Sequence, residues 1–286
     1  MNLDRAVFTA VNYDLGATMS SGQAFRWRRR DGVWTGVVGG RWVRLRPGPG
    51  QIEAQTAAPE GDWQWLRHYL QLDVNLTEVL AAFPQEDVAL QEAVRACAGL
   101  RLLRQEPWEC LASFICSSTK QISQIEQIVV LLCRRFGEAL AVPAGEEPGH
   151  SFPGYARLAE ISESDLRGCK LGFRAPYLRG TAQMLAAGEV DLGRLGRLPL
   201  EEARTELMKL PGVGMKIADC VLLFAYGFAE AFPVDVWIQR ALRRHYFPRR
   251  SVSPARLRRF IAGHFGPHAG YAQQYLFHYM RVKEGK

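Results

Sequence analysis

The spacing of apolar residues divides the chain into a strand-like part and a helical part. Between residues 20 and 56 apolar residues occur in short alternating runs, which predict β-strands. The runs are separated by Asp31-Gly32, by Gly39-Gly40 and by the Pro-Gly repeat at 47–50, which are typical of tight turns. The pattern therefore predicts an antiparallel meander with strands at 25–30, 33–38, 41–46 and 51–55.

From Gln85 onward the helical period continues with little interruption. The run 122–136 predicts a long amphipathic helix that ends at Gly137, and the Pro- and Gly-rich segment 141–154 predicts a loop. Further helices are predicted at 62–72, 76–83, 155–167, 174–188, 200–209, 215–226, 235–246, 254–264 and 269–282. We predict a mainly α fold, with an N-terminal α+β domain at 1–84 and a helical domain at 85–286.

Composition and charge indicate a folded protein with an anionic partner. The 286 residues are 48% hydrophobic and 10% aromatic, which is typical of globular chains and excludes a disordered one. The net charge of +7 favours a polyanion such as nucleic acid. No apolar run is long enough for a signal peptide or a membrane span, so we expect a soluble, cytoplasmic protein, associated with the nucleoid if bacterial.

The segment 207–226 predicts two helices joined by a tight hairpin. The hairpin consists of Pro211, Gly212, Val213 and Gly214, and its glycines permit positive φ and a close approach of another molecule to the backbone. Backbone N–H groups at the start of the second helix have no partners within the helix and can hold an anion. We interpret this hairpin as a clamp for a phosphate of the DNA backbone.

Two charged residues follow the hairpin. Lys216 lies in the first turn of the second helix, where the helix dipole disfavours a cation. It is either an ordinary solvated lysine or an amine made nucleophilic by the dipole and by desolvation. Asp235 is predicted to be the N-cap of the next helix, and a carboxylate held rigidly there can also stabilise positive charge on a bound sugar.

The stretches LPGVGMKIADC (210–220) and PVDV (233–236) resemble the signature of the helix-hairpin-helix DNA glycosylases, in the branch that has a catalytic lysine. Further matching stretches occur in the same order over nearly the whole chain. They resemble 8-oxoguanine DNA glycosylase/AP lyase of the bacterial type and are SSGQAFRW (20–27), RLLRQEPWECLASFICSS (101–118), LGFRAPYL (171–178) and GYAQQYLF (270–277). The resemblance implies an antiparallel sheet followed by helix-hairpin-helix glycosylase domains.

The resemblance also implies a bifunctional enzyme of base excision repair. The damaged nucleotide is flipped out of duplex DNA, because its glycosidic bond is out of reach while the base is stacked. The Lys216 amine would attack the anomeric carbon and displace the base. The resulting Schiff base would allow β-elimination, which nicks the strand 3′ to the lesion. Asp235 would stabilise the cationic sugar and assist proton transfers.

A base pocket follows from the same resemblance. The carbonyl of Gly22 would accept the N7–H that 8-oxoguanine has and guanine lacks. Gln273 would read the Watson–Crick edge. Phe277 and Cys220 would contact the two faces of the base, although plain core packing is the alternative for both.

Several positions depart from the family pattern where the opposite base is read. Thr119 stands where the eukaryotic enzymes have an asparagine that fills the gap left by the flipped base, and Gln124 replaces an arginine that helps to read cytosine. Phe173 replaces the usual wedge tyrosine, whereas Arg174 is retained as a cytosine reader. We therefore expect weaker discrimination for cytosine opposite the lesion. Trp237 replaces a histidine that contacts phosphate in the family.

Cofactors and partners are predicted only in outline. The six cysteines are expected to be reduced and buried, and because none follows Cys220 we predict no iron–sulfur cluster. The resemblance implies a monovalent cation at the carbonyls of the hairpin, and a monomer that binds double-stranded DNA containing 8-oxoguanine. Eight arginines between Arg240 and Arg259 either form a solvated face or extend the DNA-binding surface.

Two alternatives remain at this stage. One is a glycosylase for other damaged purines, because the altered stretch 119–124 could accompany a changed pocket. The other is a non-catalytic helix-hairpin-helix DNA-binding protein, in which Lys216 and Asp235 are merely structural.

Overall fold

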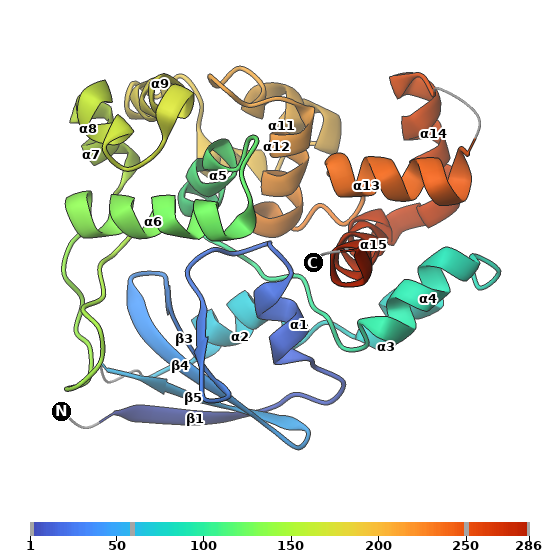
Figure 1. Ribbon diagram of the computed structural model, residues 1–286, viewed down its shortest axis with the longest axis horizontal. Helices are drawn as coiled ribbons and strands as arrows, with labels where there is room; N and C mark the ends of the chain where they lie inside the picture. The colour runs from blue at the N-terminus through green and yellow to red at the C-terminus, as the bar shows by residue number, and fades with distance from the viewer. Residues whose placement is uncertain (1–2, 58–60, 249–251, 285–286) are drawn as a thin grey trace.

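A computed structural model describes residues 3–57, 61–248 and 252–284. A five-stranded antiparallel sheet forms one side of the molecule, and the helices that follow it are packed above and beside it (Figure 1). The strand order is β1-β5-β4-β3-β2. The strands are β1 (Asp4–Thr9), β2 (Arg28–Arg30), β3 (Val33–Val38), β4 (Arg41–Gly48) and β5 (Gln51–Thr56).

The sheet confirms the predicted meander from β2 to β5 and adds one strand. β1 pairs with β5 from Asp4↔Thr56 to Thr9↔Gln51 and forms one edge of the sheet. The predicted first strand begins only at Arg28, because Phe25 packs into the core of the helices whereas Trp27 packs under the sheet. The segment before β2 therefore joins two cores and cannot continue as a regular strand.

The helices agree with the predicted fold class. They are α1 (Leu15–Ser20), α2 (Gln64–Leu70), α3 (Leu76–Ala81), α4 (Val88–Ala96), α5 (Pro107–Cys116), α6 (Ile122–Phe136), α7 (Tyr155–Glu160), α8 (Glu163–Arg167), α9 (Ala175–Ala186), α10 (Leu192–Leu195), α11 (Leu200–Leu207), α12 (Met215–Val221), α13 (Val236–Ala241), α14 (Pro254–Phe265) and α15 (Ala269–Glu284). Short 3-10 segments η1 (Gly172–Arg174) and η4 (Gly266–His268) precede α9 and α15. Helices α12 and α13 each continue into a π-helical turn, η2 (Leu222–Tyr226) and η3 (Leu242–Tyr246).

Two predicted elements differ in how well they match the structure. Helix α6 has the predicted bounds, with Gly137 as its C-cap. The stretch predicted to be helical at 155–167 is helical but divided into α7 and α8. Ser162 separates the two helices, because its hydroxyl accepts from the backbone N of Asp165 at 3.1 Å and caps α8. The proposed division at residue 84 stays a prediction.

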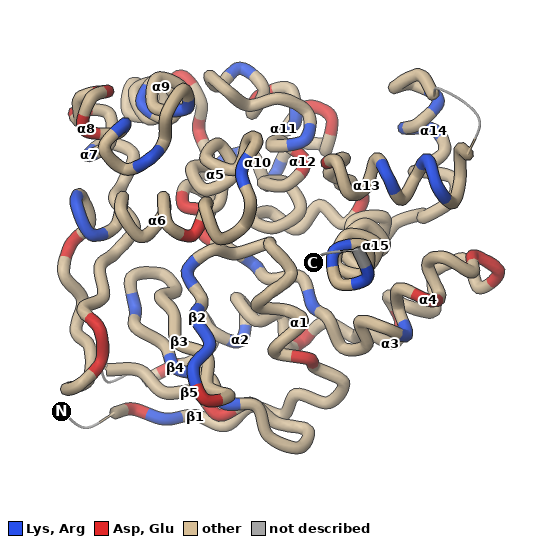
Figure 2. The backbone as a smooth tube through the Cα atoms, in the orientation of Figure 1, with Lys and Arg blue, Asp and Glu red and all other residues tan. Residues whose placement is uncertain are grey.

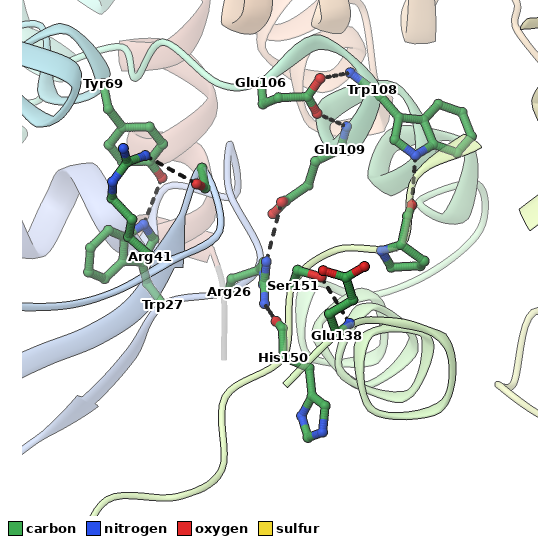
Figure 3. Close-up of polar contacts among 12 residues, drawn as sticks. Arg26, Trp27, Arg41, Tyr69, Glu106, Trp108, Glu109, Glu138, His150 and Ser151 are labelled. Atoms are coloured by element: carbon green, nitrogen blue, oxygen red, sulfur yellow. Dashed lines mark hydrogen bonds and ion pairs between the residues drawn. The ribbon is translucent and has the colours of Figure 1, made fainter. Parts of the chain in front are cut away.

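A polar cluster joins the segment before β2 to α5 and to the loop between α6 and α7 (Figure 3). Nη1 of Arg26 lies 3.3 Å from Oε2 of Glu109 on α5, and Nη2 of Arg26 donates to the carbonyl of His150. Glu106 caps α5 by accepting from the backbone N of Trp108 at 3.0 Å. These contacts hold the start of α5 in a fixed position relative to the segment before β2.

Asp87 ties α4 to two C-terminal elements. One carboxylate oxygen accepts from the backbone N of Leu90 at 3.0 Å, and the other lies 2.7 Å from Tyr246 Oη and 2.7 Å from His264 Nε2. Burial raises the pKa of this carboxyl, but the hydrogen bonds from Leu90, His264 and Tyr246 outweigh it, and the net pKa is lowered.

Asp87→Asn is expected to lower the free energy of unfolding by about 1–3 kcal/mol at pH 7. Because the folded pKa is below the ordinary value of about 3.9, the carboxylate stabilises the fold above that pH, and this contribution is lost as the pH falls through the folded pKa. Urea unfolding of wild type and variant at pH 7 and below pH 4 measures the effect. If wild type and variant differed in unfolding free energy by the same amount at both pH values, the ionised carboxylate of Asp87 would not be the stabilising group.

Two further findings concern the whole described chain. No helix within the described residues is long and apolar enough to cross a membrane. All six cysteines are buried thiols, which confirms the expectation from the sequence.

Candidate active site

A cleft of about 1470 Å³ contains five of the predicted site residues, among them the proposed lysine and aspartate. It lies between the turn after α5, the starts of α6, α12 and α13, the segment before β2 and the face of α15. Lys216, Asp235, Gly22, Phe277 and Thr119 all line it. The fold therefore brings together residues that are up to 255 positions apart in the sequence, from Gly22 to Phe277.

Lys216 extends from the first turn of α12 into this cleft. Its Nζ is 3.2 Å from Ser117 Oγ and 5.1 Å from the ring centroid of Phe114. Ser117 Oγ donates to the carbonyl of Phe114 at 2.7 Å, so its lone pairs face the amine. Neither Ser117 nor Phe114 was predicted from the sequence to have a role, because only the fold places the end of α5 against the start of α12.

Asp235 is the N-cap of α13, as predicted. Its Oδ1 accepts from the backbone N of Ile238 at 2.8 Å. Burial raises the pKa of the carboxyl, whereas this hydrogen bond and the positive charge of Lys216 lower it; the pKa is raised on balance. Asp235 is therefore a rigidly held carboxyl group that interacts electrostatically with Lys216.

The predicted hairpin joins α11 to α12. Gly212 has φ of +76°, and a Cβ there would lie 2.8 Å from the Cβ of Tyr177, so no other residue fits. Thr181 Oγ1 donates to the carbonyl of Pro211 at 3.0 Å, Val213 is buried, and Gly214 is the N-cap of α12. The hairpin lies outside the lining of the cleft and is fixed against α9.

The predicted base pocket is only partly open to the cleft. Gly22 has φ of +73°, and a Cβ there would lie 2.5 Å from Cδ1 of Ile122. Phe277 is half-buried and exposed to the cleft, whereas Cys220 and Gln273 are buried. Burial raises the pKa of the Cys220 thiol to about 12, although the charge of Lys216 lowers it. Within the described residues, Oε1 of Gln273 is buried without a hydrogen-bond partner.

The residues predicted to read the opposite base make contacts within the protein, and their proposed role stays a prediction. Only 3% of Arg174 is exposed: its guanidinium donates to the carbonyls of Leu171 and Ser118 and to Thr119 Oγ1 at 2.6 Å. Gln124 Oε1 accepts from the backbone N of Gln121 at 3.1 Å and caps α6. Phe173 is 53% exposed and packs edge-on against Tyr177.

Arg281 and Glu126 also line the cleft, although neither was predicted from the sequence. Arg281 lies on α15 one turn after Phe277, and Glu126 lies on α6. Arg281 follows Phe277 by four residues and therefore lies on the same helical face. This spacing could have identified Arg281 as a site residue from the sequence.

The arginine run falls on α13, η3 and α14. Arg240, Arg243, Arg244, Arg256, Arg258 and Arg259 are exposed, and we call this set the α13–α14 basic face. Figure 2 shows these elements at one side of the molecule, next to α15. Arg249 and Arg250 lie outside the described residues. No acidic residue occurs between Asp235 and the end of α14 in the sequence.

Among the described residues, no group of three or more His, Cys, Asp or Glu side chains is placed to hold a metal ion. The expectation that the chain carries no iron–sulfur cluster stays a prediction.

Two family descriptions match the chain. Residues 5–111 match "8-oxoguanine DNA glycosylase, N-terminal domain", and residues 112–265 match "HhH-GPD superfamily base excision DNA repair protein".

Similar proteins carry the same kind of name over most of their length. The chain is 32% identical to "N-glycosylase/DNA lyase OGG1" of Arabidopsis thaliana, over 94% of this chain and 78% of that protein. It is 31% identical to "Probable N-glycosylase/DNA lyase" of Methanothermobacter thermautotrophicus, over 94% of each. A solved structure of Clostridium acetobutylicum 8-oxoguanine glycosylase/lyase, in complex with dsDNA containing cytosine opposite to 8-oxoG, superposes with a TM-score of 0.90 at 30% identity, over 99% of each chain.

Proposed function

The chain belongs to the 8-oxoguanine DNA glycosylases of the HhH-GPD superfamily, and we propose that Lys216 and Asp235 carry out its reaction. It is an N-glycosylase/DNA lyase of base excision repair that acts on 8-oxoguanine in DNA. The observation that carries the residue assignment is the cleft in which Lys216, Asp235, Gly22 and Phe277 meet.

Lys216 is the proposed nucleophile. With its amine neutral, the lone pair of Nζ forms a bond to C1′ of the flipped nucleotide while the C1′–N9 bond breaks and its electron pair leaves with the base. The sugar ring then opens to an iminium. Loss of a C2′ proton expels the 3′ phosphate by β-elimination and nicks the strand. The contact with Ser117 Oγ supports this role, since it holds Nζ at the wall of the cleft.

Asp235 is proposed to stabilise the positive charge that develops on the sugar. Its cap bond fixes the carboxylate, so no reorganisation is needed during the reaction. In the predicted base pocket, Oε1 of Gln273 is buried and has no hydrogen-bond partner among the described residues. This acceptor suits a base with a hydrogen-bond donor on its Watson–Crick edge. Guanine and 8-oxoguanine both carry N–H groups there.

The proposal is tested by single-turnover assays on matched duplexes with 8-oxoguanine, guanine or an alkylated purine at one position. Excision and nicking of 8-oxoguanine alone are expected. Excision of the alkylated purine instead would favour the alternative substrate class. Binding without any excision would favour the non-catalytic alternative.

Excision rates are expected to be within about tenfold opposite each of the four bases. The side chains predicted to read the opposite base already form hydrogen bonds within the protein. Arg174 donates to Ser118 and Thr119, and Gln124 caps α6. A good bidentate contact with the opposite base would contribute about 1–3 kcal/mol, or roughly 5–150-fold. Single-turnover rates opposite C, A, G and T measure this. A preference for cytosine of a hundredfold would mean that Arg174 leaves its buried site when DNA binds.

The α13–α14 basic face is proposed to contact phosphates beside the lesion, because it begins at the helix that Asp235 caps. Arg258→Gln combined with Arg259→Gln is expected to weaken binding to damaged and undamaged duplex alike. The slope of log K against log[salt] should become shallower by up to about 2, close to 0.9 for each phosphate that is no longer neutralised. Fluorescence anisotropy between 50 and 300 mM salt measures this slope.

Arg157→Gln combined with Arg167→Gln is the matched control. Both arginines are exposed but pair with glutamates on their own helices, Glu160 and Glu163. An equal change in slope for both double variants would show that only the net charge matters.

A bound cation and the oligomeric state complete the proposal. A monovalent cation fits the hairpin carbonyls: those of Leu210 and Pro211 each accept one hydrogen bond, from Val213 N and Thr181 Oγ1, and retain a lone pair. Such an ion would bridge the hairpin to a DNA phosphate. We also propose that the protein acts as a monomer in the compartment that holds the DNA.

A further inference from the structure

We propose that Arg281 is a specificity-determining residue, whose guanidinium donates a hydrogen bond to the carbonyl oxygen at C8 of the flipped 8-oxoguanine. This inference rests on the proposed function. It adds to the carbonyl of Gly22 a second contact with the atoms that distinguish 8-oxoguanine from guanine.

The position of Arg281 supports this contact. On α15 it follows Gln273 by two turns and Phe277 by one, so the three side chains share a helical face. Its Cζ is 5.5 Å from the ring centroid of Phe277, and its Nη1 is 3.4 Å from the point that a Cβ on Gly22 would occupy. The guanidinium therefore lies between the residue proposed to stack on the base and the residue proposed to accept N7–H.

The guanidinium of Arg281 has N–H donors that can serve a ligand. A guanidinium carries five N–H donors, and within the described chain Nη1 donates to the carbonyl of Ser20 at 3.2 Å. Burial lowers the pKa of Arg281, while the nearby carboxylates of Asp235 and Glu126 raise it. An arginine stays protonated in such a setting, so Arg281 supplies a permanent positive charge to the cleft.

The chemistry of the lesion matches this arrangement. 8-oxoguanine differs from guanine at two adjacent atoms: N7 carries a hydrogen, and C8 carries a carbonyl oxygen. The Gly22 carbonyl and the Arg281 guanidinium together present an acceptor beside a donor, which is the complement of that edge. Guanine presents a lone pair at N7 and a hydrogen at C8, so it would leave both groups unpaired.

The same contact would assist bond breaking. As the C1′–N9 bond breaks, its electron pair passes to the base and spreads onto the C8 oxygen. A guanidinium at that oxygen stabilises the departing base. An abasic site has no base to expel, so its nicking by Lys216 does not draw on this contact.

Binding is tested with duplexes that carry a 2′-fluoro substituent, which blocks excision, on 8-oxoguanine or on guanine. Arg281→Met is expected to lower the preference for 8-oxoguanine over guanine by about tenfold or more, since a hydrogen bond to a charged group contributes at least that factor. Arg281→Lys should recover part of the preference, because it keeps a charged donor. Arg29→Met is the matched control: Arg29 is exposed on β2 and lines the same cleft, so both duplexes should weaken by the same factor.

A second assay compares chemistry on two substrates. With Arg281→Met, the loss of excision rate on 8-oxoguanine should exceed the loss of nicking rate at a preformed abasic site by about tenfold or more. Equal losses on both substrates would overturn the inference and leave Arg281 a structural residue. If wild type prefers 8-oxoguanine and Arg281→Met keeps that preference, the inference fails while the proposed function stands. If wild type shows no preference, both fail.

Discussion

Lys216→Gln is expected to abolish strand nicking and to lower base excision by at least roughly 10³-fold. An amide has no basic lone pair, so it can form neither the bond to C1′ nor the iminium that β-elimination requires. Glutamine can still form a hydrogen bond with Ser117 Oγ, which lies 3.2 Å from Nζ of Lys216. Binding to a duplex with 8-oxoguanine should therefore persist. Single-turnover excision and gel nicking assays, with anisotropy for binding, measure the three quantities.

Lys283→Gln is the matched control for this variant. It removes the same charge from an exposed position near the end of α15, where Nζ contacts Tyr279 Oη at 2.8 Å. Its rates should equal those of wild type. Nicking by Lys216→Gln at the wild-type rate would overturn the assignment of the nucleophile.

Asp235→Asn is expected to lower excision by about 10²-fold or more while stability changes by only a few tenths of a kcal/mol. Asparagine is as good an N-cap as aspartate, so the bond from Ile238 N is kept and α13 stays in place. What is lost is the negative charge that stabilises the cationic sugar. Excision rates together with urea unfolding separate the two effects.

Asp191→Asn provides the comparison. Asp191 caps α10, a helix that contributes no residue to the cleft, and its Oδ1 accepts from Gly193 N at 2.8 Å. This change should leave excision unaltered. A small loss of excision in Asp235→Asn, similar to that in Asp191→Asn, would reduce Asp235 to a structural cap.

Elements with strong local signals were predictable from the sequence. Helix α6 combines a helical apolar period with a terminal glycine, and its bounds match the prediction. Strand β1 was not predicted. It is an edge strand in which only Phe8 is buried, so its apolar pattern is weak. The interruption between α7 and α8 depends on one hydroxyl, Ser162, which a period analysis over a longer window passes over.

The site shows the same limit. Motif resemblance identified Lys216, Asp235, Gly22 and Phe277, and the fold places all four in one cleft. It did not indicate which way Arg174 points, because that depends on the carbonyls of the turn after α5. The neighbours of Lys216 and the guanidinium of Arg281 come from other elements, so only tertiary structure brings them to the reacting atoms.

The most direct test of the central claim is borohydride trapping on a duplex with a single 8-oxoguanine, followed by mass mapping of the cross-linked peptide. Borohydride reduces the iminium between enzyme and sugar to a stable amine, so only a protein that forms a Schiff base becomes linked to DNA. We predict a covalent complex that needs the lesion and maps to Lys216. A complex that maps to another residue, or excision without any trapping, would contradict this assignment.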